Sequence, residues 1–182
     1  MMGLVGGIPF LSILSPVTIF IEGDPISYPS IKNAYEASKT FDQGLRDELR
    51  LRSPEALWAN RNIPYDKLRN NWSDRLMVHV MRKLMFQKFN GNDITLVRQL
   101  LATNNRLIGY YSWDDGFWEY NDTYSCNFLG ILLMEVRTYV QAEKEVLFHH
   151  FHTNEASRKD IERFFKIDEK LAVNKLRAYD IW

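Results

Sequence analysis

A stripe of apolar residues between Trp72 and Phe89 is the feature that most constrains how this chain folds. Its members recur three and four positions apart, which is the spacing of one face of an α-helix. They are Leu76, Met77, Val80, Met81, Leu84, Met85 and Phe89. The stripe therefore predicts an amphipathic helix that ends near Asn90 and packs this face into the core.

Composition limits the class of protein. With 182 residues, 46% of them apolar, the chain is long enough for one domain with a full core. Lysine plus arginine equals aspartate plus glutamate at 23 each, so no overall field favours nucleic acid or an anionic membrane as an obligate partner. The one cysteine, Cys126, excludes an intrachain disulfide, indicates a reducing compartment and is expected to be a small buried residue.

The apolar runs are too short for a membrane protein. None reaches the ~18 to 20 residues of a membrane-spanning helix. The opening segment, residues 1–14, lacks the basic start and the cleavage pattern of a signal peptide. We therefore expect a cytoplasmic protein with no membrane partner.

Local signals predict the remaining elements. Strands are expected over residues 17–21, with a hairpin return at 26–28 after the turn Glu22–Pro25, and over residues 106–111. Helices are expected over 30–40 with Ser30 as N-cap, from Ser53 to about Arg61, and over 94–102 and 128–140. Residues 141–182 are compatible with further helices that carry apolar anchors.

The segment from Tyr110 to Asn127 has no regular period and is rich in aromatic and acidic side chains, so we expect a loop. Aromatic faces stack on heterocyclic bases for about 1 to 3 kcal/mol each, and carboxylates bind ribose hydroxyls. Its candidate ligand contacts include Trp113, Asp114, Asp115, Phe117, Trp118, Tyr120 and Asn127. The alternative is a loop that folds onto the core.

Two clusters of titratable residues have ordinary alternatives. Lys32, Glu36 and Lys39 share one helix face, which fits a functional site or a surface salt-bridge ladder worth under about 1 kcal/mol per pair. The histidines at 149, 150 and 152 do not share one face, and neither cysteine nor carboxylate stands near them at ligand spacing. We expect no metal and no other cofactor.

Several segments, in this order, resemble the motifs of the NADAR (YbiA-like) family of N-glycosidases. They are Ser12–Pro16, Tyr28–Lys39, Leu68–Trp72, Val80–Phe89, Leu100–Thr103, Asp115–Trp118 and Asn127–Arg137. The resemblance covers roughly residues 10–140. It implies an α+β fold, a mostly helical single domain with a short sheet over residues 1–140, and it leaves 141–182 as a helical extension packed on that domain.

The resemblance also implies an activity. The family hydrolyses N-glycosidic bonds, either in phosphoribosyl intermediates of riboflavin synthesis or in ADP-ribosylated guanine. The expected partner is a nucleotide or an ADP-ribose-containing small molecule, or an ADP-ribosylated nucleic acid. Cleavage develops positive charge on the sugar, so a carboxylate must offset that charge while aromatic rings hold the base.

The chain departs from the family pattern at polar positions. The family's glutamate-histidine pair is Lys32-Asn33 here, Ile13 replaces an asparagine, and Glu119 and Asn121 replace glycines. An ammonium group at the position of the glutamate reverses the local charge. One hypothesis is that the carboxylate role has moved one helical turn along the same face, to Glu36, with Lys32 paired to it.

The candidate site follows from these matches and departures. The catalytic candidates are Glu36, Lys39 and Asp115, and the substrate-binding candidates are Lys32, Arg69, Trp72, Trp118 and Asn127. The alternative is an inactive relative that binds a nucleotide, an ADP-ribosylated ligand or a protein partner. Residues 141–182 either complete the core or form an oligomer interface.

Overall fold

The computed structural model describes residues 3–4, 8–59, 63–89, 93–110, 117–119 and 126–153, without the side chains of 3–4, 58–59 and 144–153. The chain separates into two compact units, Met1–Val140 and Gln141–Trp182. The features below belong to the first unit. The packing of the second unit on the first stays a prediction, and the expected anchors and histidines beyond residue 143 lie outside the described side chains.

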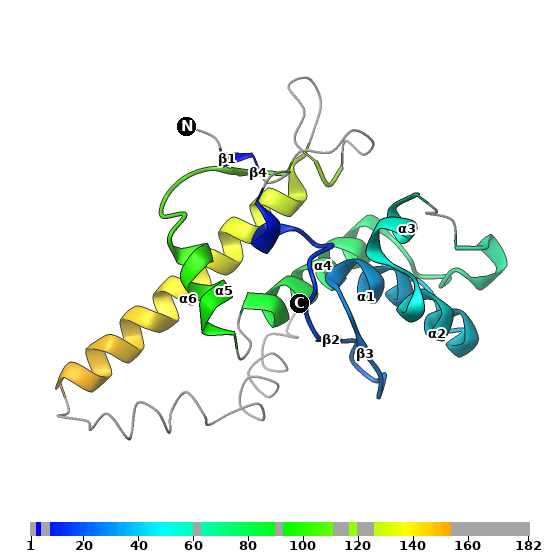
Figure 1. Ribbon diagram of the computed structural model, residues 1–182, viewed down its shortest axis with the longest axis horizontal. Helices are drawn as coiled ribbons and strands as arrows, with labels where there is room; N and C mark the ends of the chain where they lie inside the picture. Colours follow the sequence, from blue (N-terminus) through cyan, green and yellow to red (C-terminus); the bar gives the residue numbers. More distant parts are fainter. Residues whose placement is uncertain are drawn as a thin grey trace. The chain divides into compact units, whose positions relative to one another are not determined.

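Helices dominate the first unit (Figure 1). They are α1 (Ile31–Ser38), α2 (Gln43–Leu51), α3 (Pro54–Ala59), α4 (Asp74–Phe89), α5 (Ile94–Leu101) and α6 (Phe128–Thr153), with 3₁₀ turns η2 (Pro9–Leu11) and η3 (Tyr65–Lys67). α6 extends beyond the end expected from the sequence and continues into the second unit. The predicted mostly helical α+β fold is confirmed. Within the described part of the chain, no helix has the length and hydrophobicity needed to span a membrane.

Four short strands form two pairs in the described structure. β2 (Ile19–Phe20) pairs antiparallel with β3 (Ser27–Tyr28), and Gly23 in the turn between them has a φ of 77°, a conformation that suits glycine. This confirms the predicted hairpin. β1 (Gly3–Leu4) pairs in parallel with β4 (Ile108–Gly109), and β1 carried no signal that predicted it.

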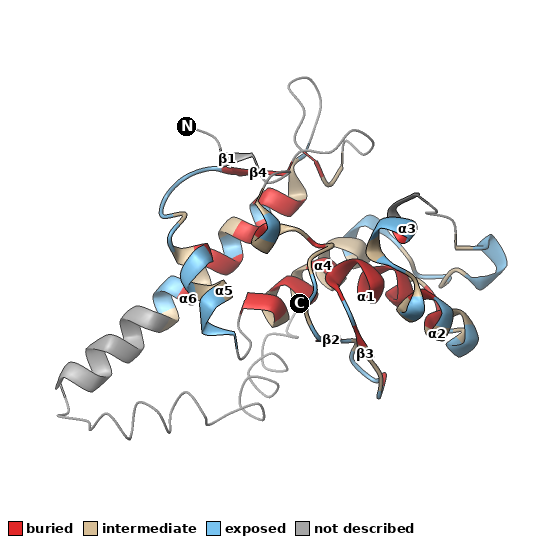
Figure 2. Cartoon of the chain, viewed as in Figure 1, coloured by how far each residue is buried: buried red, intermediate tan, exposed pale blue. Residues whose placement is uncertain are grey.

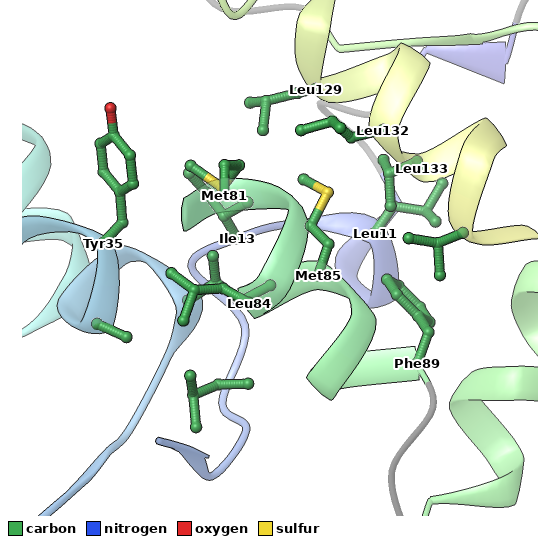
Figure 3. Packing of buried hydrophobic residues seen from close by; sticks show 14 of the residues in the cluster. Leu11, Ile13, Tyr35, Met81, Leu84, Met85, Phe89, Leu129, Leu132 and Leu133 are labelled. Carbon is green, nitrogen blue, oxygen red and sulfur yellow. The ribbon is translucent and has the colours of Figure 1, made fainter. Parts of the chain in front are cut away.

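The apolar stripe of α4 forms much of the core. Met81, Leu84, Met85 and Phe89 are buried. They belong to one cluster with Leu11 of η2 and with Leu129, Leu132 and Leu133 of α6 (Figure 3). The helix predicted from the stripe is confirmed, although its first turns are only half-buried.

Two features differ from the sequence expectations. α2 was not predicted, because its buried face consists of only Arg46 and Leu49 and its start depends on the Asp42 side chain, which accepts a hydrogen bond from the Leu45 amide. The expectation that Cys126 is buried is wrong, since the residue is exposed ahead of α6.

α1 is the most deeply enclosed helix of the described part: all eight of its residues are buried (Figure 2). It packs against α2, α3 and α4 and against both strands of the hairpin. Ser30 caps it as predicted, since its Oγ accepts a hydrogen bond from the Asn33 amide at 3.1 Å. A helix enclosed on all sides is normally apolar. α1 instead buries Lys32, Asn33 and Glu36, and each of these polar groups needs a partner.

Candidate functional site

Two lysines, one in α1 and one at its C-cap, form ion pairs with a single carboxylate, that of Glu36 in α1. Lys32 Nζ lies 2.7 Å from Glu36 Oε1, and Lys39 Nζ lies 2.8 Å from Glu36 Oε2. Lys32 is 6% exposed and Glu36 is 2% exposed, so the alternative of a surface ladder is wrong. Lys39 is the most accessible member, with 17% of its side chain exposed. The pairing expected between Lys32 and Glu36 is present.

The start of α1 is fixed by the loop that precedes it. The Lys32 amide donates to the Ile13 carbonyl at 3.0 Å, and Ile13 itself is buried in the core. Lys88 of α4 holds the same loop, because its Nζ donates to the Ser12 carbonyl at 2.7 Å and to Ser15 Oγ at 2.6 Å. Burial lowers the pKa of Lys88 to about 8. A buried lysine that is bonded to neutral oxygens thus supports the first turn of α1.

Asn33, at the position of the family's histidine, connects helices. Its Nδ2 donates to the carbonyls of Leu49 at 2.8 Å and Arg52 at 2.9 Å, at the C-terminal end of α2. Its Oδ1 accepts a hydrogen bond from Ser30 Oγ. Helix ends leave carbonyl groups without helical partners, and Asn33 satisfies two of them. This departure from the family pattern therefore has a structural role.

An aromatic cluster borders the accessible end of the charged group. The Tyr35 ring lies edge-to-face with Trp72 at 5.8 Å and with Trp118 at 5.7 Å between ring centres. Lys39 Nζ lies 4.8 Å from the centre of the Tyr35 ring. The structure thus brings Trp72 and Trp118, both half-buried, to the helix that carries Glu36 and Lys39. Tyr35 joins them but was not among the predicted site residues, because a tyrosine close to Ala34 and Ala37 favours an interpretation as helix packing.

Arg69 is attached to the same end of α1. Its amide donates to the Lys39 carbonyl at 2.9 Å, and its guanidinium donates to the Ser38 carbonyl at 3.1 Å. The guanidinium also lies 4.3 Å from the centre of the Phe41 ring, and burial lowers the pKa of Arg69. Arg69 lines a cavity of about 440 Å³ that is formed by residues 41–42 and 66–71.

Asn127 ties β4 to the start of α6. Its Oδ1 accepts a hydrogen bond from the Tyr110 amide at 3.1 Å, and its Nδ2 donates to the Ile108 carbonyl at 3.0 Å. The Leu129 amide donates to the Trp118 carbonyl at 3.2 Å, which holds Trp118 beside this turn. The Asn127 amide group is therefore occupied by backbone, and its contact with substrate stays a prediction. Asp115, with Trp113, Asp114 and Tyr120, lies outside the described residues.

Comparison with known proteins gives a consistent result. A search of protein-family models found none that matches. The chain is 32% identical over 129 residues to "N-glycosidase YbiA" of Shigella boydii serotype 4, an alignment that covers 68% of this chain and 78% of that protein. The protein of the same name from Escherichia coli K12 is 31% identical over 126 residues with the same coverage.

The fold agrees with these relatives. The NMR structure of the E. coli protein YbiA superposes with a TM-score of 0.62 at 30% identity, covering 74% of this chain and 79% of that one. Both comparisons span most of the segment that carries the ordered motifs. The chain therefore belongs to the NADAR, or YbiA-like, family of N-glycosidases.

Proposed function

We propose that the chain hydrolyses the N-glycosidic bond of a nucleotide-type substrate, with Lys39 as the group that binds the phosphate of the sugar and Glu36 as the carboxylate that offsets the charge on the sugar ring. The observation that carries the proposal is the Glu36 carboxylate held between two lysines, of which Lys39 is the more accessible. Family membership supplies the reaction class.

The chemistry requires negative charge near the sugar. As the bond between the anomeric carbon and the base nitrogen breaks, positive charge develops on the ribose ring, water attacks the carbon and the base takes up a proton. Glu36 has both oxygens fixed by ammonium groups, so its orientation is set before substrate binds. Lys39 is the most accessible member of the cluster and its Nζ lies 4.8 Å from the centre of the Tyr35 ring, so its ammonium group would bind the phosphate carried by the ribose rather than the ring that gains positive charge.

Two substrate classes fit the proposal. They are the phosphoribosyl intermediates of riboflavin synthesis and ADP-ribosylated guanine, free or within a nucleic acid. Each joins a heterocyclic base to a ribose that carries phosphate. Trp72 and Trp118, packed on Tyr35, supply aromatic surface beside Lys39 on which such a base would stack.

A second candidate function has its own supporting observation. Lys32 stands at the position of the family's glutamate and occupies one oxygen of Glu36. An ammonium group there weakens the negative charge available to an oxocarbenium-like sugar. The second candidate is therefore a relative that binds the same ligands without cleaving them.

Turnover assays distinguish the two candidates. The purified chain would be incubated with ADP-ribosylated guanosine and with the phosphoribosylamino-pyrimidine, and base release followed by chromatography. We expect release from one of them and a loss of about 100-fold or more in Lys39→Met. Glu36→Gln should lose a similar factor, whereas Glu48→Gln, a matched change at an exposed residue of α2, should keep the rate.

Each result of these assays supports one of the two candidate functions. Saturable binding by calorimetry with no product from the wild type would favour the second candidate. Full turnover in both Lys39→Met and Glu36→Gln would refute the assigned roles. Lys39→Met is the safer variant, because Lys39 is partly exposed and Glu36 keeps Lys32 as a partner.

A further inference from the structure

The cavity at the C-terminal end of α1 has no part in the reaction proposed above. Two segments form it: residues 41–42, between α1 and α2, and residues 66–71, which begin within η3 and end just before Trp72. Its volume is about 440 Å³. That volume falls within the range of about 300 to 1,000 Å³ typical of small-molecule sites. A purine base or a nucleoside fits within such a space.

The lining has the chemistry of a site for a flat, polar-edged ring. Phe41 is 69% exposed, which is unusual for a phenylalanine, and the Arg69 guanidinium lies 4.3 Å from its ring centre. Asn70 and Asn71 are exposed, and their amides offer both donors and acceptors. A nucleobase presents the matching groups: a π-face for Phe41 and a hydrogen-bonding edge for the amides.

Two of the charged residues that line the cavity are paired with each other. Lys67 Nζ lies 2.9 Å from Asp42 Oδ2, and hydrogen bonding to Asp42 raises the pKa of Lys67. Arg69 donates to the Ser38 carbonyl and lies over Phe41. Two carboxylates and two cationic groups line the cavity, so it has no net positive charge to attract a phosphate. The lining therefore favours a base over an anion.

One short segment connects this cavity to the candidate site. Residues 66–71 line the cavity, and Trp72, the next residue, contacts Tyr35 beside Lys39. The Arg69 amide is hydrogen-bonded to the Lys39 carbonyl, and the Trp72 amide to the Arg69 carbonyl. A ligand with one base at the aromatic cluster and a second base in the cavity would lie along this segment.

We infer that the cavity of Phe41, Arg69, Asn70 and Asn71 binds a purine base that does not react, supplied by the part of the substrate distant from the scissile bond. The inference rests on the proposed function for the position of the scissile bond. It does not require that the bond be cleaved. The shared chemistry is a purine base, and it is offered by a free nucleotide or by a neighbouring nucleotide of a single strand.

Binding measurements on the full chain test the inference. Calorimetry would compare adenosine monophosphate, ribose 5-phosphate and a short single-stranded oligoadenylate. We expect adenosine monophosphate or the oligoadenylate to bind, and ribose 5-phosphate to bind at least tenfold more weakly. Phe41→Ala should weaken binding of the adenine probe by about tenfold or more, and Phe41→Tyr should retain it.

A matched control and a second variant make the result decisive. Phe20→Ala removes another exposed phenylalanine, on β2, and should leave binding unchanged. Asn71→Ala should weaken the adenine probe and leave ribose 5-phosphate unaffected. Unfolding midpoints would show that every variant remains folded.

The inference is overturned if neither adenine probe binds, if Phe41→Ala binds as well as the wild type, or if ribose 5-phosphate binds as tightly as adenosine monophosphate. Binding that depends on Phe41, in a chain that releases no base from either proposed substrate, would instead support the cavity and refute the proposed hydrolase. The tighter of the two adenine probes identifies the source of the base.

Discussion

α1 and the first turn of α6 both carry residues aligned with family motifs, but they use them differently. In α1 the buried side chains of Lys32 and Glu36 form an ion pair, and Glu36 forms a second one with Lys39. At the start of α6, Asn127 and Gly130 contact the backbone of β4. α1 thus brings charged side chains together, whereas the start of α6 joins that helix to β4.

This difference decides what family membership transfers. The residues of α6 that match the pattern are explained by packing: Arg137, for instance, donates to Thr103 Oγ1 at 2.8 Å and to the Arg106 carbonyl at 2.9 Å. The departures fall in α1, where Lys32 reverses a charge and Asn33 bonds to the end of α2. Similarity therefore carries the fold directly, whereas the chemistry depends on how Glu36 and Lys39 are used.

The largest effect should come from removing the carboxylate of α1. Glu36→Gln leaves the buried ammonium group of Lys32 and the partly exposed one of Lys39 around a neutral amide, so we expect the free energy of unfolding to fall by about 3 to 5 kcal/mol. Urea unfolding at neutral pH measures it. Glu48→Gln removes an exposed carboxylate and should cost under about 1 kcal/mol. Equal losses in the two variants would show that the α1 ion pairs are not specially buried.

The α6 region should respond to shape rather than charge. A Cβ on Gly130 would lie 2.1 Å from the Ile108 carbonyl oxygen and 2.5 Å from the Asn127 amide atoms. Gly130→Ala must push β4 and α6 apart, and we expect a loss of about 3 kcal/mol in thermal or urea unfolding.

Gly44→Ala is the matched control for that change. A Cβ on Gly44, in α2, would meet only Asp42 Oδ1 at 3.4 Å, an ordinary contact. Alanine favours a helix over glycine, so this variant should gain up to about 1 kcal/mol. A gain at both positions would contradict the close approach of α6 to β4.

The sequence predicted the parts of the fold that have a clear period or cap. The stripe of α4, the Ser30 cap and the hairpin around Gly23 each act over a few residues, so local reasoning found them. α2 was missed because its buried face consists of only Arg46 and Leu49. Arg46 is buried because it pairs, at 3.2 Å, with the carboxylate of Asp24, a residue far from it in the sequence. β1 was missed because two residues pair with a strand more than a hundred positions away.

The candidate site divides in the same way. Helical spacing placed Lys32, Glu36 and Lys39 on one face, but whether that face was buried depended on the packing of α2, α3 and α4 around α1. Tyr35 and Phe41 were missed because an aromatic residue shows its function only through neighbours such as Trp72 and Arg69. No signal in the sequence predicted the cavity, because the exposure of Phe41 and its place between α1 and α2 are known only from the structure.

A moderate effect should follow from changing Asn127. Asn127→Ala removes both side-chain bonds to β4 and leaves a residue with a φ of 48° that alanine disfavours, so we expect a loss of about 2 kcal/mol. Asn127→Gly also removes the hydrogen bonds, but glycine adopts this φ without strain, so its free energy of unfolding should fall by less than that of Asn127→Ala. Hydrogen exchange at the Tyr110 amide should accelerate in both variants, and unchanged exchange would contradict the role assigned to Asn127.

The smallest effect, per pH unit, should come from Lys88, which supports the loop under α1. Because its pKa is about 8 in the folded chain and 10.5 is the ordinary value, the unfolded chain binds more protons above pH 8. The free energy of unfolding should therefore rise with pH between about 8 and 9.5, by at most about 1.4 kcal/mol per unit. The rise must be measured below pH 10. Burial raises the pKa of Tyr110 from 10.0 to about 12, so above pH 10 the unfolded chain loses this proton first and the stability falls with pH. Lys88→Met should abolish the rise and Lys67→Met should keep it; a rise that persists without Lys88 would place the pH dependence outside the α1 support.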